Sequence, residues 1–202
     1  MDRVNLGVLA SHGGSNLQAI IDACEQDVLN ARVRVAISNN ADSTALSRAA
    51  KHSIPNFHRS GKTHPDPVEL DAEIARLLEA HEVDIVALAG YMKKVGPITL
   101  RRFARRILNI HPALLPKHGG AGMFGLRVHQ AVLEAGETTT GVTIHVVDEE
   151  YDRGPIVAQC EVDVLPGDSP ESLADRVLER EHAFYVETLR RITSGEINLS
   201  TL

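Results

Sequence analysis

Strand-like and helix-like segments alternate along the first 111 residues, and this alternation constrains the fold more than any other feature. The strand-like runs, short and mostly β-branched or apolar, are residues 4–10, 33–38, 53–57, 84–89 and 106–111. Helical spacing of apolar residues predicts helices between them over 16–24, 43–52, 68–81 and 97–106. Alternating elements of this kind form a mostly parallel sheet with helices on both faces. We therefore predict an α/β protein with an open, doubly wound, Rossmann-like sheet.

The second half of the chain has a different character. Four glycines fall within the seven residues 119–125, which we expect to lie in a loop. Residues 142–147 and 156–164 alternate between apolar and polar side chains and are separated by a turn over 148–154, so they predict an antiparallel pair. A long closing helix is predicted over 170–194, opened by Ser169 with Ser172 behind it.

Composition and charge exclude several classes of protein. The net charge of −6 and the seven aromatic residues argue against a nucleic-acid-binding surface. The longest apolar run, 85–92, is far shorter than the ~20 residues that cross a bilayer. Cys24 and Cys160 lie in no CxxC motif, and the chain leads from Met1 directly into a strand-like run, so we expect a cytoplasmic protein without disulfides or a signal peptide. One basic cluster, 101–106, reads as a solvated helix face, with an anion-binding face as the alternative.

The loop Ser11-His-Gly-Gly-Ser-Asn16 joins the first predicted strand to the first predicted helix. Glycines at this position let backbone N–H groups approach an anion, and the helix N-terminus adds a partial positive charge. The loop matches neither the dinucleotide fingerprint nor the phosphate loop of nucleotide triphosphatases. It therefore predicts either a phosphate site or a tight connection in which Ser15 or Asn16 caps the helix.

Asn109 and His111 stand two residues apart at the end of a predicted strand, so their side chains point to the same face. Pro112 favours an extended backbone at His111 and ends the strand, at the sheet edge where α/β proteins bind ligands. An amide donor and an imidazole there can stabilise an oxyanion and move a proton. A strand end in which both side chains bond to backbone groups is the alternative.

Two further residues are candidates for the same place. Asp152 stands in a predicted turn, and a carboxylate beside a histidine would favour the imidazolium and fix its orientation. For Asp152, the alternative is a turn without a role in the site. His145, on the predicted strand before that turn, could point towards the same site; the alternative is a half-buried histidine whose hydrogen bonds are satisfied elsewhere. The ten histidines show no HxxxH or HExxH spacing, so we predict no metal site, and no GxSxG elbow is present.

Together these segments resemble the folate-dependent formyltransferase family. Residues 109–116 (NIHPALLP), followed by 152–155 (DRGP), carry the likeness to the family. Residues 14–20, 38–40, 88–92, 141–145 and 181–183 are similar to its purine-biosynthesis branch, so the likeness covers nearly the whole chain. It implies one formyltransferase domain over 1–202, with a phosphate- and nucleotide-binding half over 1–100 and a catalytic and folate-binding half over 101–202.

The resemblance implies transfer of a formyl group from 10-formyltetrahydrofolate, the co-substrate, to the amine of glycinamide ribonucleotide (GAR), by direct attack and without a metal. It implies that Asn109 and a protonated His111 stabilise the oxyanion while Asp152 assists proton transfer. It places GAR on Gly14, Ser15, Asn16, Pro112 and Glu181. It places the folate on Met92, Lys93, Lys94, Val95, Asn109, His145 and Asp148. It also implies a cis peptide bond between Leu115 and Pro116.

The chain departs from the family pattern at three places. His12 stands where the family often has glycine, and the segment 117–129 is longer and richer in glycine than the family's short loop, as a mobile lid would be. Pro67 stands where an arginine often meets the glutamate tail of the folate, and Lys62 or Lys93 are the candidates to replace it.

Three alternatives to GAR formylation stay open at this point, as does the choice between monomer and homodimer. A formyltetrahydrofolate hydrolase uses the same Asn, His and Asp but usually carries an N-terminal regulatory domain, whereas this chain starts on its first strand. A methionyl-tRNA formyltransferase needs a longer chain with a basic C-terminal domain. A non-catalytic nucleotide-binding module would need the glycine loop alone.

Overall fold

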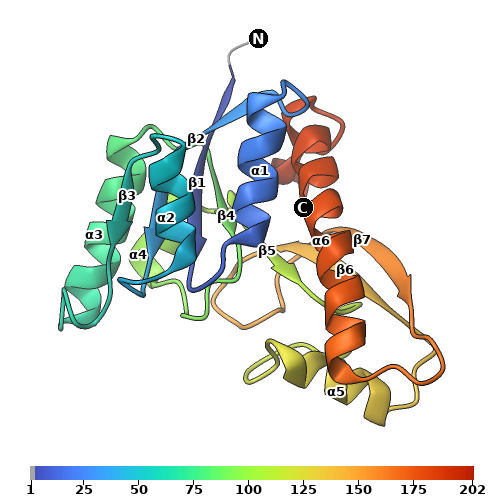
Figure 1. Ribbon diagram of the computed structural model, residues 1–202. Coiled ribbons are helices and arrows are strands. Elements are labelled where there is room, and N and C mark those ends of the chain that lie inside the picture. Colours follow the sequence, from blue (N-terminus) through green and yellow to red (C-terminus); the bar gives the residue numbers. More distant parts are fainter. Residues whose placement is uncertain (1–2) are drawn as a thin grey trace.

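The structure is a computed structural model that describes residues 3–202. Its seven-stranded sheet has the order β3-β2-β1-β4-β5-β6-β7 (Figure 1). The parallel part consists of β1 (Val4–Ala10), β2 (Ala31–Ser38), β3 (Asn56–His58), β4 (Ile85–Leu88) and β5 (Ile107–His111). β6 (Thr139–Val146) pairs antiparallel with β5, and β7 (Ile156–Asp163) pairs antiparallel with β6. The predicted parallel sheet with an antiparallel extension is confirmed.

Six α-helices and one short 3₁₀ helix cover the two faces of the sheet. They are α1 (Ser15–Glu25), α2 (Thr44–Lys51), α3 (Pro67–Ala80), α4 (Pro97–Arg102), α5 (Leu126–Glu134), α6 (Pro170–Thr193) and the 3₁₀ helix η1 (Leu199–Thr201). Buried side chains from α1, α2, α5 and α6 share one core cluster, and those from α3 share the other, across the sheet. α1 and α6 lie side by side in Figure 1. No helix within residues 3–202 is long and apolar enough to cross a membrane.

Two helix predictions need correction. α4 ends at Arg102 instead of residue 106, because Arg105 adopts a left-handed φ of 60° that turns the chain into β5. α5 was not predicted, and His129, which we expected in a loop, lies buried on this helix. The neighbouring glycines hide the start of α5, whose N-cap is Gly125. α6 begins as predicted, with Ser169 and Ser172 forming a reciprocal capping box.

The loops that follow β1, β2 and β4 are tied together at the carboxyl edge of the sheet. The Ser11 N–H donates to the Gly90 carbonyl (3.0 Å), and the Ser11 hydroxyl accepts from the Met92 N–H (2.7 Å). The same hydroxyl donates to Asn39 Oδ1 (2.5 Å), and the Asn40 amide donates to the Ser11 carbonyl (2.6 Å). The chain order reverses between β1 and β4, and such a switch point is where open α/β sheets bind ligands.

Candidate active site

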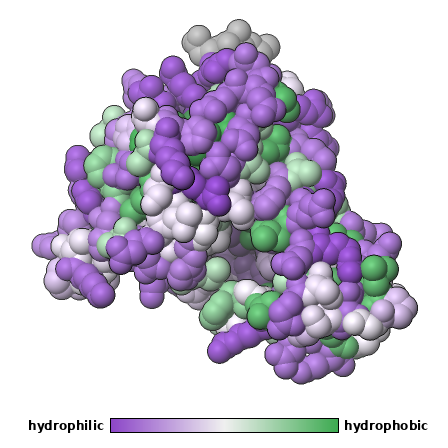
Figure 2. Space-filling view, viewed as in Figure 1, coloured by the Kyte–Doolittle hydropathy of each residue, from purple (hydrophilic) through white to green (hydrophobic). Residues whose placement is uncertain are grey.

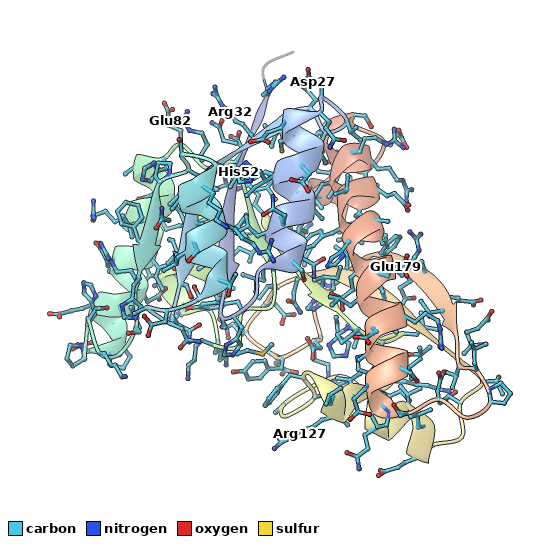
Figure 3. The ribbon with its side chains drawn as sticks, viewed as in Figure 1. Asp27, Arg32, His52, Glu82, Arg127 and Glu179 are labelled. Atoms are coloured by element: carbon cyan, nitrogen blue, oxygen red, sulfur yellow. The ribbon has the colours of Figure 1, made fainter. Side chains whose placement is uncertain are left out.

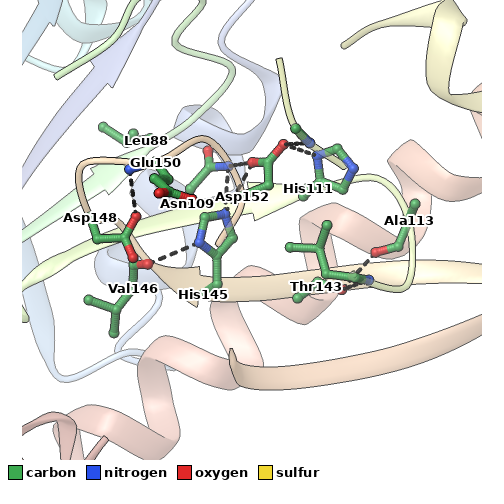
Figure 4. Close-up of polar contacts among 12 residues, drawn as sticks. Leu88, Asn109, His111, Ala113, Thr143, His145, Val146, Asp148, Glu150 and Asp152 are labelled. Atoms are coloured by element: carbon green, nitrogen blue, oxygen red, sulfur yellow. Dashed lines mark hydrogen bonds and ion pairs between the residues drawn. The ribbon is translucent and has the colours of Figure 1, made fainter. Parts of the chain in front are cut away.

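Asn109, His111 and Asp152 meet at the carboxyl end of β5 (Figure 4). Asn109 Nδ2 lies 3.5 Å from Asp152 Oδ1, and His111 Nδ1 lies 3.6 Å from Asp152 Oδ2. The Asp152 side chain, which comes from the turn between β6 and β7, is 11% exposed and that of His111 is 4% exposed. The three side chains that we expected to converge are therefore in direct contact, with the carboxylate between the other two.

His145 belongs to the same group of side chains. It lies opposite Asn109 in the pairing of β5 with β6, and its Nε2 is 3.1 Å from Asn109 Nδ2 and 3.4 Å from Asp152 Oδ1. Its Nδ1 donates to the Val146 carbonyl (3.0 Å), which fixes the orientation of the ring. His145 is thus a buried neighbour of both Asn109 and Asp152. The register between β5 and β6 places it there.

The glycine-rich segment supplies two backbone groups that we did not predict. The Gly120 N–H donates to Asp152 Oδ2 (2.9 Å), and His111 Nε2 donates to the His118 carbonyl (2.8 Å). Asp152 itself has a left-handed φ of 55°. This segment therefore orients both the imidazole and the carboxylate.

The segment after His111 is anchored on β6. The Thr143 hydroxyl donates to the Ala113 carbonyl (2.7 Å) and accepts from the Leu115 N–H (3.0 Å). The Leu115–Pro116 bond is cis, as the resemblance implied. Pro112, a candidate for GAR binding, is half-buried between His111 and this anchored turn.

The charges of the site are set by burial as much as by its ion pairs. Burial lowers the pKa of His111, and the Asp152 carboxylate and the His118 carbonyl only partly oppose this effect. Burial acts to raise the pKa of Asp152, but the hydrogen bond with His145, the charge of His111 and the Gly120 N–H hold that pKa below its usual value. At neutral pH the site therefore contains an ionised Asp152 and a neutral His111. The lowered pKa of His111 opposes the protonated form that we expected to stabilise the oxyanion.

Asn16 and Glu181, both candidates for GAR binding, lie together between α1 and α6. The Asn16 amide donates to Glu181 Oε2 (2.7 Å), and Glu181 is 8% exposed. Burial raises the pKa of Glu181 to about 7, against the opposing effect of the Asn16 hydrogen bond. A carboxyl group buried with one amide partner and no counter-charge is typical of a functional site.

The N-terminus of α1 is open. Its N-cap is Gly14, with a left-handed φ of 67°, and no side chain caps the helix. The alternative in which Ser15 or Asn16 acts as the N-cap was therefore wrong. The first N–H groups of a helix have no acceptor within it, and no acidic residue occupies the first turn of α1. This end of the helix suits an anion.

We expect Glu181→Gln to stabilise the protein at alkaline pH. The folded-state pKa of about 7 exceeds the usual 4.5. Above pH 7, keeping the ionised carboxylate buried therefore lowers the free energy of unfolding by about 3 kcal/mol. Stability therefore falls as pH rises from 4.5 to 7. Urea unfolding should show Glu181→Gln to be more stable than the wild type at pH 8, by up to about 3 kcal/mol, and little changed at pH 5. An equal effect at both pH values would contradict this account.

Two hollows adjoin these residues. A small pocket of about 60 Å³ is lined by Asn109, His145 and Asp152 together with four of the other candidates for folate contact, Lys93, Lys94, Val95 and Asp148. Met92 lines neither hollow, and the residue is 43% exposed. A cleft of about 1190 Å³, which the sequence did not predict, shares Tyr91, Lys93 and Lys94 with the small pocket. Figure 2 shows the surface hollowed between the main body and the lobe that carries α5.

A possible metal-ligand group lies elsewhere. Within residues 3–202, Asp22, Glu25 and His52 form the one group of three whose ligand atoms lie within 4.8 Å of one another. It sits on the outer surface of α1 and α2, with both carboxylates exposed (His52 is labelled in Figure 3). The residues around Asp152 do not include such a group.

Comparison with known proteins gives the family. Residues 4–189 match the model described as formyl transferase. The chain belongs to the formyl transferase family. It is 42% identical over 196 residues to the chloroplastic phosphoribosylglycinamide formyltransferase of Arabidopsis thaliana, covering 96% of this chain and 67% of that protein. It is 41% identical over 194 residues to the phosphoribosylglycinamide formyltransferase of Haemophilus influenzae, covering 96% of this chain and 89% of that protein.

Solved structures of the family agree. The glycinamide ribonucleotide transformylase 1 of Symbiobacterium toebii superposes with a TM-score of 0.89 at 41% identity, over 96% of this chain and 89% of that one. A formyltetrahydrofolate deformylase from Pseudomonas syringae superposes with a TM-score of 0.85 at 28% identity, over 96% of this chain and 62% of that one. The fold is therefore shared by proteins that are named for different activities, a transformylase and a deformylase.

In this formyl transferase, α6 connects the Asn16–Glu181 pair to the strand that carries Asn109 and His111. The Tyr185 hydroxyl lies 3.0 Å from the Leu108 carbonyl of β5 and 3.3 Å from the Leu88 carbonyl of β4. Glu181 precedes Tyr185 by one helical turn and therefore lies on the same face of α6. The contact fixes the Asn16–Glu181 pair relative to the strand that carries Asn109 and His111.

Proposed function

We propose that this protein transfers the formyl group of 10-formyltetrahydrofolate to the amine of glycinamide ribonucleotide, a reaction of purine biosynthesis. The observation that carries the proposal is the direct contact of Asn109 and His111 with Asp152 at the carboxyl end of β5. The open N-terminus of α1 adds a place for the ribonucleotide phosphate. Relatives about 40% identical over nearly the whole chain carry the name phosphoribosylglycinamide formyltransferase, which supports the same substrates.

The ribonucleotide binds between α1 and α6 in this proposal. Its phosphate accepts hydrogen bonds from the backbone N–H groups at Gly14, Ser15 and Asn16, where the helix dipole favours negative charge. Glu181, held by the Asn16 amide, accepts hydrogen bonds from the hydroxyl groups of the ribose. The glycinamide amine then reaches past Pro112 toward the end of β5.

The folate donor binds on the other side of Asn109. Its pterin end enters the small pocket beside Val95, His145 and Asp148, and the loop 92–95 lies along it. The formyl group then faces Asn109. In this arrangement the two substrates approach each other across Asn109 and His111, and such positioning supplies several kcal/mol of the rate acceleration.

The reaction begins with attack of the neutral amine on the formyl carbon, which places negative charge on the formyl oxygen. The Asn109 N–H that faces Asp152 at 3.5 Å is at the limit of a hydrogen bond, so it can turn to that oxygen. One donor in such a position is typically worth ~10²–10³ in rate. The formyl carbon then transfers fully to the amine as its bond to the folate N10 breaks.

The proton follows the opposite route. Neutral His111 accepts the proton of the attacking amine at Nδ1, where Asp152 Oδ2 lies 3.6 Å away and pairs with the new charge. The proton then passes to the departing folate nitrogen, so the products are formyl-GAR and tetrahydrofolate. No covalent intermediate with the protein is required.

Hydrolysis of the donor is the second candidate, because water can replace the amine at the same residues and a structurally similar protein is a formyltetrahydrofolate deformylase. The anion site on α1 and the Asn16–Glu181 pair favour the ribonucleotide, since water needs neither. Purified protein should be assayed with 10-formyltetrahydrofolate in the presence and absence of GAR. We expect tetrahydrofolate and formyl-GAR to form only when GAR is present. Release of formate at the same rate without GAR would overturn the proposal in favour of hydrolysis, and no reaction at all would favour a binding module.

A further inference from the structure

The loop that joins β1 to α1 is held from one side by α2 and by the residues that lead into it. Both helices begin at the lower end of the sheet in Figure 1. Three successive loop carbonyls accept from that side: Ser11 from the Asn40 amide (2.6 Å), His12 from the Ala45 N–H (3.0 Å) and Gly13 from Arg48 Nε (2.9 Å). Arg48 is the one charged donor among these three.

Arg48 holds a single peptide of this loop, the one between Gly13 and Gly14. In a trans peptide the carbonyl and the N–H point in opposite directions, so the Gly14 N–H points away from the guanidinium. Arg48 Nη1 also donates to Gln18 Oε1 (3.1 Å), which fixes the guanidinium against the first turns of α1. The bond to the Gly13 carbonyl therefore sets the direction of the first N–H that the proposed phosphate site uses.

The charge of Arg48 has no counter-ion. Among the described residues, 3–202, no carboxylate lies within ion-pair distance of its guanidinium, which bonds to a carbonyl and to a neutral amide. Burial lowers the pKa of His182 on α6, and the charge of Arg48 lowers it further, against the opposing charge of Glu179. Arg48 therefore adds positive potential to the space between α1 and α6, where the proposed function places the ribonucleotide.

The start of α1 lacks partners for its donors and for one buried acceptor. No side chain caps the helix, and its first turn holds no acidic residue. Asn16 Oδ1 is buried without a hydrogen-bond partner in the part of the chain that the structure describes, and the residue is 6% exposed. Buried polar groups are nearly always paired. A ligand that carries an anionic group next to hydroxyl groups, as a phosphorylated ribose does, supplies both missing partners.

We propose that Arg48 is a positioning residue for the ribonucleotide phosphate and makes the protein select the phosphorylated acceptor over its phosphate-free riboside. The inference rests on the proposed function, which places that phosphate on the N–H groups of residues 14–16. Arg48 acts through the peptide between Gly13 and Gly14: its bond to the carbonyl fixes the Gly14 N–H and polarises it toward the anion. Its charge adds an attraction that only a charged ligand experiences.

The test compares GAR with glycinamide riboside, which carries the same amine and ribose without the phosphate. In Arg48→Gln, kcat/KM for GAR should fall about tenfold while kcat/KM for the riboside stays within about twofold. Inorganic phosphate should inhibit the wild type in competition with GAR, and its inhibition constant should rise by a similar factor in the variant. A purely structural role in holding α2 would lower kcat/KM for both acceptors equally, and circular dichroism checks the fold.

The matched control is Lys51→Gln. Lys51 is the exposed last residue of α2 and lies one helical turn from Arg48, so its substitution removes a positive charge from the same helix without touching the loop. It should keep the wild-type ratio of the two kcat/KM values. Arg48→Lys is the second variant, for use if Arg48→Gln does not fold, and should lower the ratio about threefold because an ammonium lacks the planar fork that bonds both Gly13 and Gln18.

Two results would overturn the inference while formyl transfer itself stands. One is an unchanged ratio of kcat/KM for GAR to kcat/KM for the riboside in a folded Arg48 variant. The other is an equal loss of that ratio in Lys51→Gln. Absence of formyl transfer from the wild-type protein to GAR would overturn the proposed function and the inference with it.

Discussion

Asp152→Asn should lower kcat by about 10²–10⁴ while the fold survives. The amide keeps the size of the side chain but removes the charge that pairs with His111 once that ring takes a proton at Nδ1. The substitution also replaces one of two carboxylate oxygens by an NH₂ group. In the wild type, Oδ1 faces His145 and Oδ2 accepts from the Gly120 N–H. Single-turnover formyl transfer with both substrates saturating measures the loss, and circular dichroism checks the fold.

Glu149→Gln is the matched control for Asp152→Asn. Glu149 lies in the same turn, is exposed and does not line the small pocket, so its substitution should leave kcat within about twofold of the wild type. The pH profile separates a catalytic from a purely structural role. Asp152 raises the pKa of His111 against the larger lowering effect of burial, so its neutralisation should move the acid limb of kcat/KM to lower pH. Near-normal turnover, or an unmoved acid limb, would remove Asp152 from the proposed chemistry.

The sequence predicted those parts of the site that local rules control. A period of two puts Asn109 and His111 on one face of β5, and Pro112 ends the strand beside them. The capping box at Ser169 and the alternation that marks β6 and β7 are equally local, and the structure confirms both. The mostly parallel character of the sheet followed from the alternation of strands and helices over the first half of the chain.

The features of the site that we did not predict arise from contacts between residues that are distant along the chain. The Gly120 N–H and the His118 carbonyl come from a glycine-rich segment without periodicity, so nothing in that segment predicted their direction. The sequence also provides no measure of how deeply His111 is buried, and this burial lowers its pKa against the opposing effect of the nearby carboxylate. The large cleft is formed by loops after several strands, and only their arrangement in space creates it.

Gly14→Ala should raise the KM for GAR by about 10- to 100-fold and reduce the free energy of unfolding by about 2–4 kcal/mol. Gly14 has a φ of 67°, which costs a residue with a side chain ~1–2 kcal/mol. An added Cβ would also lie 2.7 Å from Ala45 Cβ and 2.8 Å from Ala45 Cα, so α2 or the first turn of α1 must move. The Ala45 N–H donates to the His12 carbonyl (3.0 Å), and this bond couples α2 to the loop.

Gly13→Ala is the matched control for Gly14→Ala. It removes a glycine from the same loop without crowding a neighbouring residue. An added Cβ at Gly13 meets nothing within 4 Å, and its φ is not left-handed, so stability and the KM for GAR should stay close to the wild type. Because the proposed phosphate site uses the N–H groups at the start of α1, Gly14→Ala should raise the KM for GAR and leave the KM for the folate donor within about twofold. Steady-state kinetics with each substrate varied in turn measures both. A rise confined to the donor, or a normal KM for GAR in a folded Gly14→Ala protein, would move the ribonucleotide phosphate away from α1.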